Sequence, residues 1–533
     1  MTACTSPLFG TAVKVAEHLI SSNAGTPTLH WVGRAGHGRH DGGASALCVG
    51  SDDVGLELLA SLILLCLSIV RASSTLRSAC AKLVLFFQEK RTEKNEKKER
   101  SCPIIAYLCH TMERREFIKV ASAAACAAAL LPSVGSLMTG CTPPVTIDGD
   151  SSGKWDFDEI VDRSGTWSTK YGRAAEGQIP MWIADMDFRT APAVSSALKE
   201  RLNRDVLGYT STPEEFYQSI VQWEKEMHGW QVDKEWVAYC PGVITAINQA
   251  YLTFTEPGDS IIVMPPVYNL FRMYAERLGR RVIDNPLLFD GEHYRMDFDG
   301  LERILSNSDA KILVLCNPHN PAGIVWDRDA LRRIAALCRQ KGVLVISDEI
   351  HGDLTLPSHQ HTPFCSVSAA AEAIGLVFAG PTKSFNLAGV SMTAYCVIPN
   401  EALREPYLKH LEDAKLDEAP IASLVATIAA YTEGAPWLLS LREYLQGNIR
   451  EVVDFFSKND LGIKAIPPQA SFLVWLDCRA MGLSQEALMK FFSDKAGLLL
   501  SNGAMYGQGG EGFVRMNIGC PRKIVKEALG RIL

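Results

Sequence analysis

Short apolar runs alternate with helical stretches over the C-terminal two-thirds of this 533-residue chain. Each run is rich in Val, Ile and Leu and ends in polar residues, Pro or Gly, a pattern typical of strands buried on both faces of a parallel sheet. One intervening segment, residues 327–342, has apolar positions at helical spacing and ends in Lys-Gly, a helix stop signal. The pattern predicts a doubly wound α/β domain. Its strands are expected within SIIVMPP (260–266), AKILVLCNP (310–318), GVLVISDEI (342–350) and IGLVFAGP (374–381).

Polar and small residues follow the apolar runs directly. In doubly wound folds ligands bind at the carboxyl ends of the strands, so these segments are candidates for one shared site. Taken singly, each segment has another explanation as a turn, a tight loop or a helix cap. Their recurrence after successive strands favours a binding site. The segments are PGVITAI (241–247), PPVYNLF (265–271), NPHNPAG (317–323), SDEIHGD (347–353) and GPTKSFN (380–386).

Charge and cysteine content exclude several other classes of protein. The formal net charge is -7, and the sequence contains no concentrated basic face of the kind that nucleic-acid binding requires. The fifteen cysteines show no paired C-x-x-C spacing, so neither a metal site nor a dense disulfide framework is indicated. With 47% hydrophobic residues, the chain has ample material for a large core.

The N-terminal part differs from the rest of the chain. Residues 1–111 contain a Gly/Ser-rich segment, one short apolar run and a run of charged residues. We interpret them as a wrongly assigned N-terminal extension that precedes the true start at Met112. Residues 112–141 resemble a twin-arginine export signal that ends in a lipoprotein-like box, with Cys141 as the lipidated residue; an Ala-rich helix is the alternative. A linker, 142–154, follows. The expected product is exported and lipid-anchored or periplasmic, touching a membrane only through the signal or lipid, and cytoplasmic if the signal is unused.

Lys383 is a candidate chemical group, because a lysine at a buried strand end loses its proton more readily and can form a Schiff base with an aldehyde. Pyridoxal 5'-phosphate is the aldehyde cofactor that suits this setting, and it needs further partners. A helix start at Gly242, Val243 and Ile244 offers backbone N–H groups to its phosphate.

Three more residues after the apolar runs match the remaining needs of that cofactor. Asp348 suits the pyridine nitrogen, which must stay protonated to withdraw electrons. Tyr268 can lie against the ring, and the Asn320 amide can donate to the phenolic oxygen. Every requirement of the cofactor therefore has a candidate residue.

From about residue 155 to the end, the chain resembles the fold-type I pyridoxal-phosphate enzymes, and within them the MalY/PatB-type cystathionine β-lyases. The resemblance implies a large doubly wound domain over 196–420 and a smaller α+β domain made from 155–195 and 421–533. The motifs that carry it are PMWIADMDF, LGYT, NPHNPAG, ISDEIH, TKSFNLAG, YTEGAPWL and GFVRMNIGCPR.

The resemblance also implies roles for individual residues. Lys383 would be the Schiff-base lysine, with Asp348, Asn320 and Tyr268 in the roles given above. Tyr209 would reach the phosphate in a neighbouring subunit, which makes a homodimer the expected active unit. Arg515 would bind the substrate carboxylate with two parallel hydrogen bonds.

The chain departs from the common aminotransferase pattern at the cofactor site. His351 stands where a tyrosine is usual, and Gly380 stands where a serine often binds the phosphate, with Thr382 as the candidate replacement. Ser391 replaces an arginine. The phosphate site is therefore expected to differ from that of the aminotransferases.

The activity implied is α,β-elimination from a small amino-acid substrate, cystathionine or a related cysteine S-conjugate, to a thiol, pyruvate and ammonia. In that reaction Lys383 would remove the Cα proton. Two alternatives stay open: an aminotransferase of the same fold, which shares every cofactor contact, and a regulatory protein that binds the cofactor and acts through protein contacts.

Overall fold

The computed structural model describes residues 155–390 and 392–533. The predicted extension, export signal and linker, with Cys141, lie outside the described residues, as does Ser391. Among the residues described, no helix is both long and apolar enough to cross a membrane. All seven cysteines in this part of the chain are buried free thiols.

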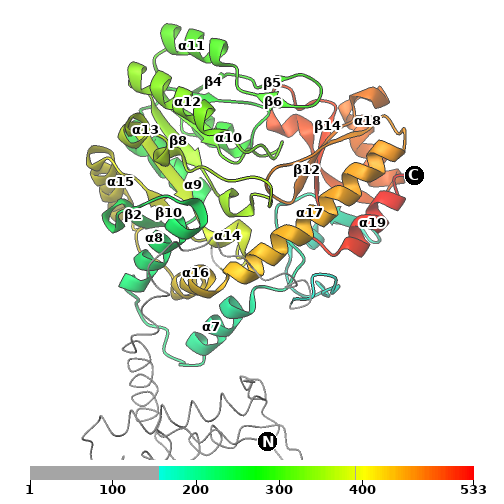
Figure 1. Ribbon diagram of the computed structural model, residues 1–533, viewed down its shortest axis with the longest axis horizontal. Coiled ribbons are helices and arrows are strands. Elements are labelled where there is room, and N and C mark those ends of the chain that lie inside the picture. Colours follow the sequence, from blue (N-terminus) through cyan, green and yellow to red (C-terminus); the bar gives the residue numbers. More distant parts are fainter. Residues whose placement is uncertain (1–154, 391) are drawn as a thin grey trace, which may run out of the picture. The chain divides into compact units, whose positions relative to one another are not determined.

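A seven-stranded sheet forms the centre of the larger region (Figure 1). Its strands are parallel except for β10, which runs antiparallel to both of its neighbours. The prediction of a mostly parallel sheet is thus confirmed. In spatial order the strands are β2 (Val237–Cys240), β10 (Ala394–Val397), β9 (Gly375–Ala379), β8 (Leu344–Asp348), β7 (Ala310–Cys316), β3 (Ser260–Val263) and β4 (Arg281–Asp284).

Helices cover both faces of this sheet, which explains why its strands are apolar without a break. Along β7, Ile312 and Val314 join one hydrophobic cluster with α9, whereas Leu313 and Leu315 join a second cluster with α12. Successive side chains of a strand point to opposite faces, so each face needs its own apolar cover. The helices packed on it include α8 (Glu214–His228), α9 (Val243–Phe254), α10 (Leu270–Arg277), α12 (Arg328–Lys341), α13 (Ala369–Ile374), α15 (Glu401–Asp413) and α16 (Ile421–Glu433).

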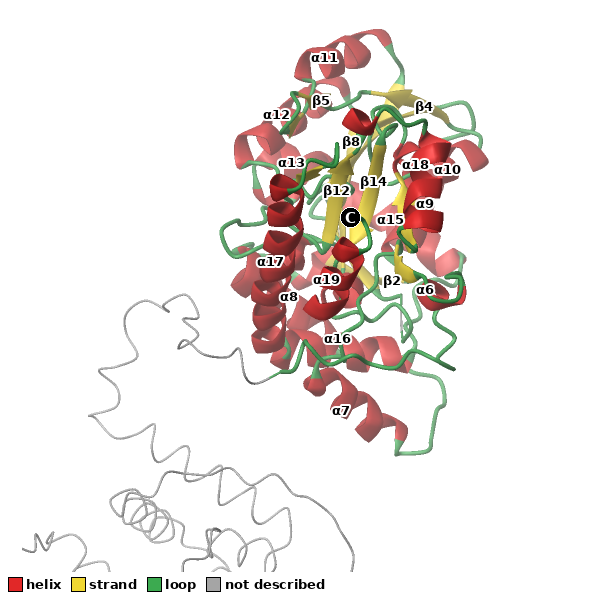
Figure 2. Cartoon of the chain, turned by 90° about the vertical axis from the view of Figure 1, so that its right-hand side faces the viewer, coloured by secondary structure: helices red, strands yellow, loops and turns green. Residues whose placement is uncertain are grey.

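A second sheet of five strands joins the two ends of the described chain. Strand β1, from the segment before the large sheet, pairs in parallel with β13, and the other strands pair antiparallel. Helices α17 (Ala435–Lys458) and α19 (Arg522–Gly530) lie side by side next to these strands (Figure 2). The domain boundaries given above remain predictions. The strand order is β1 (Ile179–Met181), β13 (Leu498–Asn502), β14 (Phe513–Asn517), β12 (Leu473–Asp477) and β11 (Lys464–Ile466).

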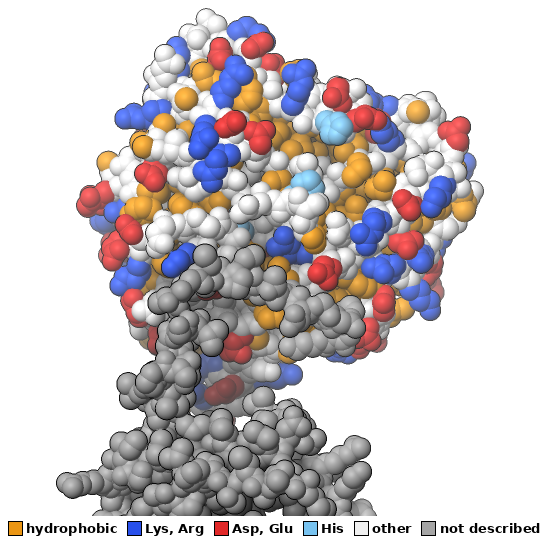
Figure 3. Space-filling view, in the orientation of Figure 1, with side chains coloured by type: hydrophobic (Ala, Val, Ile, Leu, Met, Phe, Trp, Pro, Cys, Tyr) orange, Lys and Arg blue, Asp and Glu red, His pale blue; other side chains and the backbone are white. Residues whose placement is uncertain are grey.

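The remaining elements are short or peripheral. On the face seen in Figure 3, cationic and anionic side chains are interspersed rather than gathered by sign. A mixed surface of this kind offers no single-sign patch on that face. The elements are α6 (Thr169–Gly172), α7 (Pro192–Leu202), α11 (Phe298–Asn307), α14 (Pro381–Ser384), α18 (Gln485–Lys490), β5 (Leu288–Phe289) and β6 (Tyr294–Arg295).

Candidate functional site

The carboxyl ends of three neighbouring parallel strands bring the predicted site residues together. In the sheet register, Asp348 at the end of β8 lies between Cys316 of β7 and Phe378 of β9. Asn320 follows β7, and Lys383 follows β9 in the short helix α14. The strand-end rule therefore correctly predicted one shared location for these groups.

Lys383 is held against the backbone of a distant segment. Its Nζ donates a hydrogen bond of 2.7 Å to the carbonyl oxygen of Ala184. Burial, and then the positive charge of Arg515, lower the pKa of Lys383 to about 8. A lysine with this pKa is neutral often enough near neutral pH to act as a nucleophile or a base.

Asp348 is a buried carboxylate at the end of β8. Only 5% of the residue is exposed, and its Oδ1 accepts a hydrogen bond of 3.1 Å from the Ile350 backbone N–H. Among the described residues it has no ion-pair partner within 4.0 Å. Burial raises the pKa of Asp348 to about 7. A buried carboxylate in this state suits a cationic ligand group such as a protonated pyridine nitrogen.

The start of α9 has the features of an anion site. The helix begins at Val243, no side chain caps it, and its first turn contains no acidic residue. Gly242 precedes it at φ 94°, and a Cβ there would lie 2.8 Å from the Met392 carbonyl oxygen, so only glycine fits. The first N–H groups of the helix, including those of Val243 and Ile244, are suited to bind a phosphate.

The structure explains the missing serine at position 380. A Cβ on Gly380 would lie 2.7 Å from the carbonyl oxygen of Thr393, so any side chain would collide with the neighbouring backbone. The hydroxyl of Thr382 donates to that same carbonyl at 2.7 Å. Its hydrogen is therefore engaged, and Thr382 as a phosphate ligand stays a prediction.

Arg515 reaches the site from β14 of the five-stranded sheet. Its Nη1 donates to Asn320 Oδ1 at 3.0 Å, and its Nη2 donates to the Trp182 carbonyl oxygen at 2.8 Å. The Nε atom is buried without a hydrogen-bond partner among residues 155–390 and 392–533, which leaves a donor for a ligand. Because Asn320 Oδ1 faces Arg515, its amide nitrogen remains available to a phenolic oxygen.

Two further predicted residues, His351 and Tyr268, lie within range of the positive charge of Arg515. Burial lowers the pKa of His351 to about 3, so its ring is neutral, and its Nδ1 has no hydrogen-bond partner in the part of the chain that the structure describes. Burial also raises the pKa of Tyr268 to about 12, and this side chain interacts with Asp348 and Arg515 through charge. Both rings are therefore uncharged in this site.

Tyr209 is the predicted site residue that stands out for its exposure. It is fully exposed in the loop between α7 and α8, next to Val206 and Leu207, which are 72% and 61% exposed. Its predicted contact with a neighbouring subunit stays a prediction.

A second buried group of hydrogen-bonded side chains, which includes Ser384 of α14, was not predicted from the sequence. Asp353 accepts hydrogen bonds from Trp223 Nε1 at 2.8 Å and from Ser384 Oγ at 2.9 Å, and lies 2.9 Å from His228 Nε2. We call these four residues the Asp353 cluster. Asp353 is part of the quoted SDEIHGD segment, but His228 and Trp223 come from α8, so their proximity is a tertiary feature that local spacing does not show.

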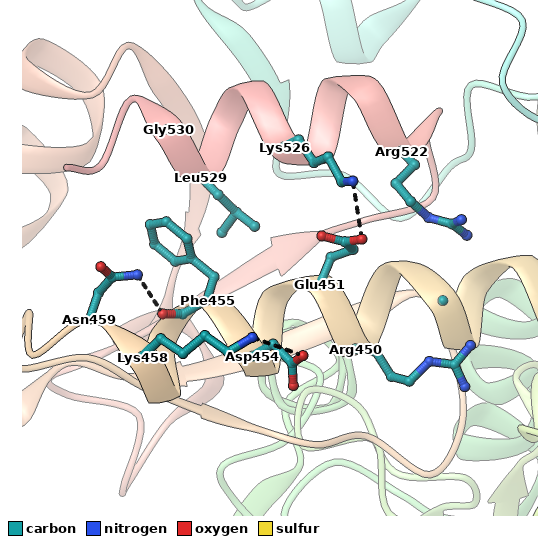
Figure 4. Close-up of a pocket in the computed structure, with 11 residues that line it drawn as sticks. Arg450, Glu451, Asp454, Phe455, Lys458, Asn459, Arg522, Lys526, Leu529 and Gly530 are labelled. Atoms are coloured by element: carbon teal, nitrogen blue, oxygen red, sulfur yellow. Dashed lines mark hydrogen bonds and ion pairs between the residues drawn. The ribbon is translucent and has the colours of Figure 1, made fainter.

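A groove of about 640 Å³ lies elsewhere, between α17 and α19 (Figure 4). None of the predicted site residues lines it. Several of its charged groups are already paired, as Lys526 with Glu451 at 3.3 Å and Lys458 with Asp454 at 3.4 Å (Figure 4). The groove is therefore separate from the strand-end site.

Comparison with known proteins agrees with this geometry. A family model described as aminotransferase class I and II matches residues 176–532. Cystathionine beta-lyase PatB of Bacillus subtilis is 40% identical over 381 residues, covering 70% of this chain and 98% of that protein. Protein MalY of Escherichia coli is 34% identical, with 71% and 98% covered.

Solved structures show the same similarity. Cystalysin of Treponema denticola, which contains pyridoxal 5'-phosphate, has a TM-score of 0.68 and 32% identity over 71% of this chain and 98% of its own. A PLP-bound C-S lyase of Staphylococcus hominis has a TM-score of 0.66 and 30% identity, covering 71% of this chain and 97% of its own.

Proposed function

The chain belongs to the class I and II aminotransferase family, in its branch of cystathionine β-lyases, and from this premise we propose that it is a pyridoxal-phosphate-dependent carbon–sulfur β-lyase. It eliminates a thiol from cystathionine or a related cysteine S-conjugate, and the 2-aminoacrylate left behind hydrolyses to pyruvate and ammonia. The observation that carries the lyase assignment is the 40% identity to PatB across 98% of that protein.

The residues at the strand ends fit the cofactor. Asp348 is a buried carboxylate with no ion-pair partner within 4.0 Å in the described part of the chain, and the uncapped start of α9 presents N–H groups where an anion is needed. Lys383 would hold the aldehyde carbon, Asp348 the pyridine nitrogen, Asn320 the phenolic oxygen and Gly242 to Ile244 the phosphate. Bound pyridoxal phosphate supplies the electron sink that makes the Cα–H bond acidic.

Lys383 is the base in this proposal. Its pKa of about 8 leaves a useful share of neutral amine near neutral pH, so its Nζ can accept the Cα proton. The electron pair of the broken C–H bond then allows the Cβ–S bond to break, and the sulfur leaves as a thiolate that takes up a proton. Asp348 keeps the pyridine nitrogen protonated because each charge stabilises the other in a buried site.

Arg515 positions the substrate. Its guanidinium holds the Asn320 oxygen and the Trp182 carbonyl oxygen, and a substrate carboxylate can replace these neutral acceptors with two charge-assisted hydrogen bonds. The exchange favours binding of an α-carboxylate. A carboxylate held by Arg515 would limit the orientations that the Cα–H bond can take relative to Lys383.

One assay separates the lyase from an aminotransferase. Purified holoenzyme is incubated with cystathionine without any keto acid, and thiol, pyruvate and ammonia are quantified. Equimolar release of the three supports the lyase. Amino-group transfer to an added keto acid without thiol release would overturn it in favour of the aminotransferase. A panel of other cysteine S-conjugates then ranks the leaving thiols.

We also propose that the active unit is a homodimer in which Tyr209 completes the phosphate site of the other subunit. The exposure of Tyr209, Val206 and Leu207 on one loop supports it, because exposed apolar groups in a cluster mark interaction sites. Mixed dimers of a Lys383→Ala chain and a Tyr209→Ala chain test it. Action across subunits restores one intact site and about half of the wild-type activity per dimer. Action within one subunit restores none.

For the leader, we propose export by the twin-arginine route with lipidation at Cys141. The support is the sequence RREFIK followed by an apolar segment and MTGC. Cell fractionation of a chain starting at Met112 tests it, with Arg114→Lys/Arg115→Lys as the matched control. Membrane or periplasmic enzyme that becomes cytosolic in the control supports the proposal, and a cytosolic product from both chains contradicts it.

A further inference from the structure

A run of backbone carbonyl groups borders Lys383 and Arg515. It belongs to residues 182–187, which follow β1 and which we call the 182–187 segment. Every carbonyl oxygen from residue 182 to residue 186 accepts a side-chain hydrogen bond. The donors are Arg515 and Ser501 to Trp182, Asn517 to Ile183, Lys383 to Ala184, Asn517 and Lys170 to Asp185, and Asn386 and Arg163 to Met186.

Two asparagines hold this segment on either side of Ala184. Asn517 is fully buried, and its Nδ2 donates to the carbonyl oxygens of Ile183 at 2.5 Å and Asp185 at 2.7 Å. Asn386 accepts from the Met186 N–H at 2.9 Å and donates to the Met186 carbonyl oxygen at 2.8 Å. The Ala184 carbonyl is thus fixed by bonds to both neighbouring residues.

Each of the two asparagines lies close in the chain to one of the cationic site residues. Asn386 lies one turn after Lys383, and Asn517 lies on the same strand as Arg515. Asn386 adopts a left-handed conformation, φ 57°, which asparagine tolerates better than most residues and which points its amide at Met186. The position of the Ala184 carbonyl relative to Lys383 is therefore set by the elements that carry Lys383 and Arg515.

We propose that the Ala184 carbonyl oxygen is the acceptor that holds Lys383 Nζ whenever this nitrogen is not bonded to the cofactor, and that Asn386 and Asn517 are positioning residues for it. This deepens the proposed function and rests on it for the role of Lys383. The Cα proton taken up by Nζ is then held in a hydrogen bond to Ala184. That bond stabilises the ammonium form against the desolvation that disfavours it.

Other charges also act on Lys383 and must stay constant in a test. Asp348 of β8 and Asp185 of the 182–187 segment raise its pKa, whereas Arg515 of β14 lowers it. His351, in the loop after β8, is neutral through its own low pKa. Replacing either asparagine adds no charge and removes none of these groups. Because Asn517 also binds the Asp185 carbonyl, Asn386→Ala, which loses only the bonds to Met186 in this segment, is the cleaner report on the Ala184 carbonyl.

The test measures Lys383 directly in the cofactor-free full chain. Wild type, Asn386→Ala and Asn517→Ala are labelled briefly with acetic anhydride over a range of pH, and the Lys383 peptide is quantified by mass spectrometry. The matched control is Asn400→Ala, because Asn400 also binds one backbone carbonyl, at Ala373, and one backbone N–H, at Ala402, outside the site. The expected result is a fall of about one unit in the apparent pKa of Lys383 in both variants and none in the control.

An unchanged Lys383 titration in a folded Asn386→Ala or Asn517→Ala protein would overturn the proposal and leave the asparagines a structural role alone. If both alanine variants fail to fold, Asn386→Gly carries the test, since glycine tolerates the φ of 57° at this position, removes both bonds to Met186 and adds no charge. The rate of labelling at fixed pH is then compared with an Asn400→Gly control. Labelling needs no substrate, so its outcome is independent of whether the enzyme is a lyase.

Discussion

Two buried aspartates at the same edge of the large sheet have opposite surroundings. Asp348 accepts one backbone hydrogen bond and has a pKa raised by burial to about 7. Asp353, a few residues later, is equally buried, but bonds from His228, Trp223 and Ser384 outweigh burial and lower its pKa below the ordinary value. The difference separates a group that awaits a ligand from a group that holds the fold together.

Two lysines repeat the contrast. Lys170 is 1% exposed and lies 2.7 Å from Asp187, whose other oxygen lies 2.6 Å from Arg163. Lys383 has a neutral carbonyl as its hydrogen-bond partner and a lowered pKa. A buried charge such as that of Lys170 is tolerated in the folded chain because of its partner. A buried ionisable group without an ion-pair partner, such as Lys383, costs stability but remains available for catalysis.

The largest expected effect comes from removing the unpaired lysine. Lys383→Met should reduce β-elimination by at least about a thousandfold, because both the covalent anchor and the base are lost. It should leave or raise the free energy of unfolding of the cofactor-free protein. Lys170→Met should instead lower that free energy by about 1–3 kcal/mol, since Asp187 loses its buried lysine partner and keeps Arg163. Steady-state kinetics and urea unfolding of both variants measure the two effects; equal destabilisation would contradict the contrast.

Replacing the two aspartates should likewise reduce activity in one case and stability in the other. Asp348→Asn should lower kcat by about a hundredfold or more, because an amide does not keep the pyridine nitrogen protonated. Asp353→Asn should cost about 3–5 kcal/mol of unfolding free energy, because His228 loses its countercharge. Comparison of kcat with the urea midpoint for each variant checks this. A stable, inactive Asp353→Asn protein together with an unstable Asp348→Asn protein would reverse the assignment.

The pH dependence of stability sharpens the comparison. The pKa of Asp348 is raised from 3.8 to about 7, so the folded cofactor-free protein favours the protonated acid, and ionisation costs stability as pH rises between these values. Asp348→Asn should therefore be more stable than wild type at pH 8, by up to about 4 kcal/mol, and equal to it near pH 4. Unfolding of the two proteins across this range measures the difference, and a constant difference would count against a raised pKa.

The smallest expected effect concerns Ser384, which follows Lys383 in the chain and belongs to the Asp353 cluster. Ser384→Ala removes one hydrogen bond to Asp353 and should cost about 1–3 kcal/mol of stability. Activity should fall by less than about tenfold, because the bond from Lys383 to Ala184 does not pass through Ser384. Thermal unfolding and kcat of this variant are the measurements, with Ser366→Ala, a hydroxyl bonded only to its own turn, as the control. A loss like that of Lys383→Met would place Ser384 in the chemistry.

Much of the site could be predicted from local sequence, because parallel strands place their carboxyl ends together whatever their order. This rule located Asp348, Asn320 and Lys383 from the apolar runs before them. It does not locate Arg515, which comes from the middle of β14 in another sheet and was assigned only by resemblance. Gly380 also needed the structure, since the nearby Thr393 carbonyl is what excludes a side chain there.

The parts that local sequence does not predict depend on long-range contacts. The 182–187 segment has no periodicity of its own, and its backbone is held by Asn386 and Asn517 from far along the chain. The Asp353 cluster joins α8 to α14 in the same way. Side chains that bind distant backbone leave no spacing signal, so only the fold shows them.

The central claim is that Lys383 and Asp348, neither of which forms an ion pair with another described residue, are the centre of the cofactor site. Borohydride reduction of the reconstituted holoenzyme, followed by mass spectrometry of its peptides, tests it most directly, since reduction fixes the imine as a stable bond. The account predicts the pyridoxyl group on the peptide containing Lys383, with loss of the cofactor's visible absorbance. A pyridoxyl group on another lysine, or none on any peptide, would contradict it.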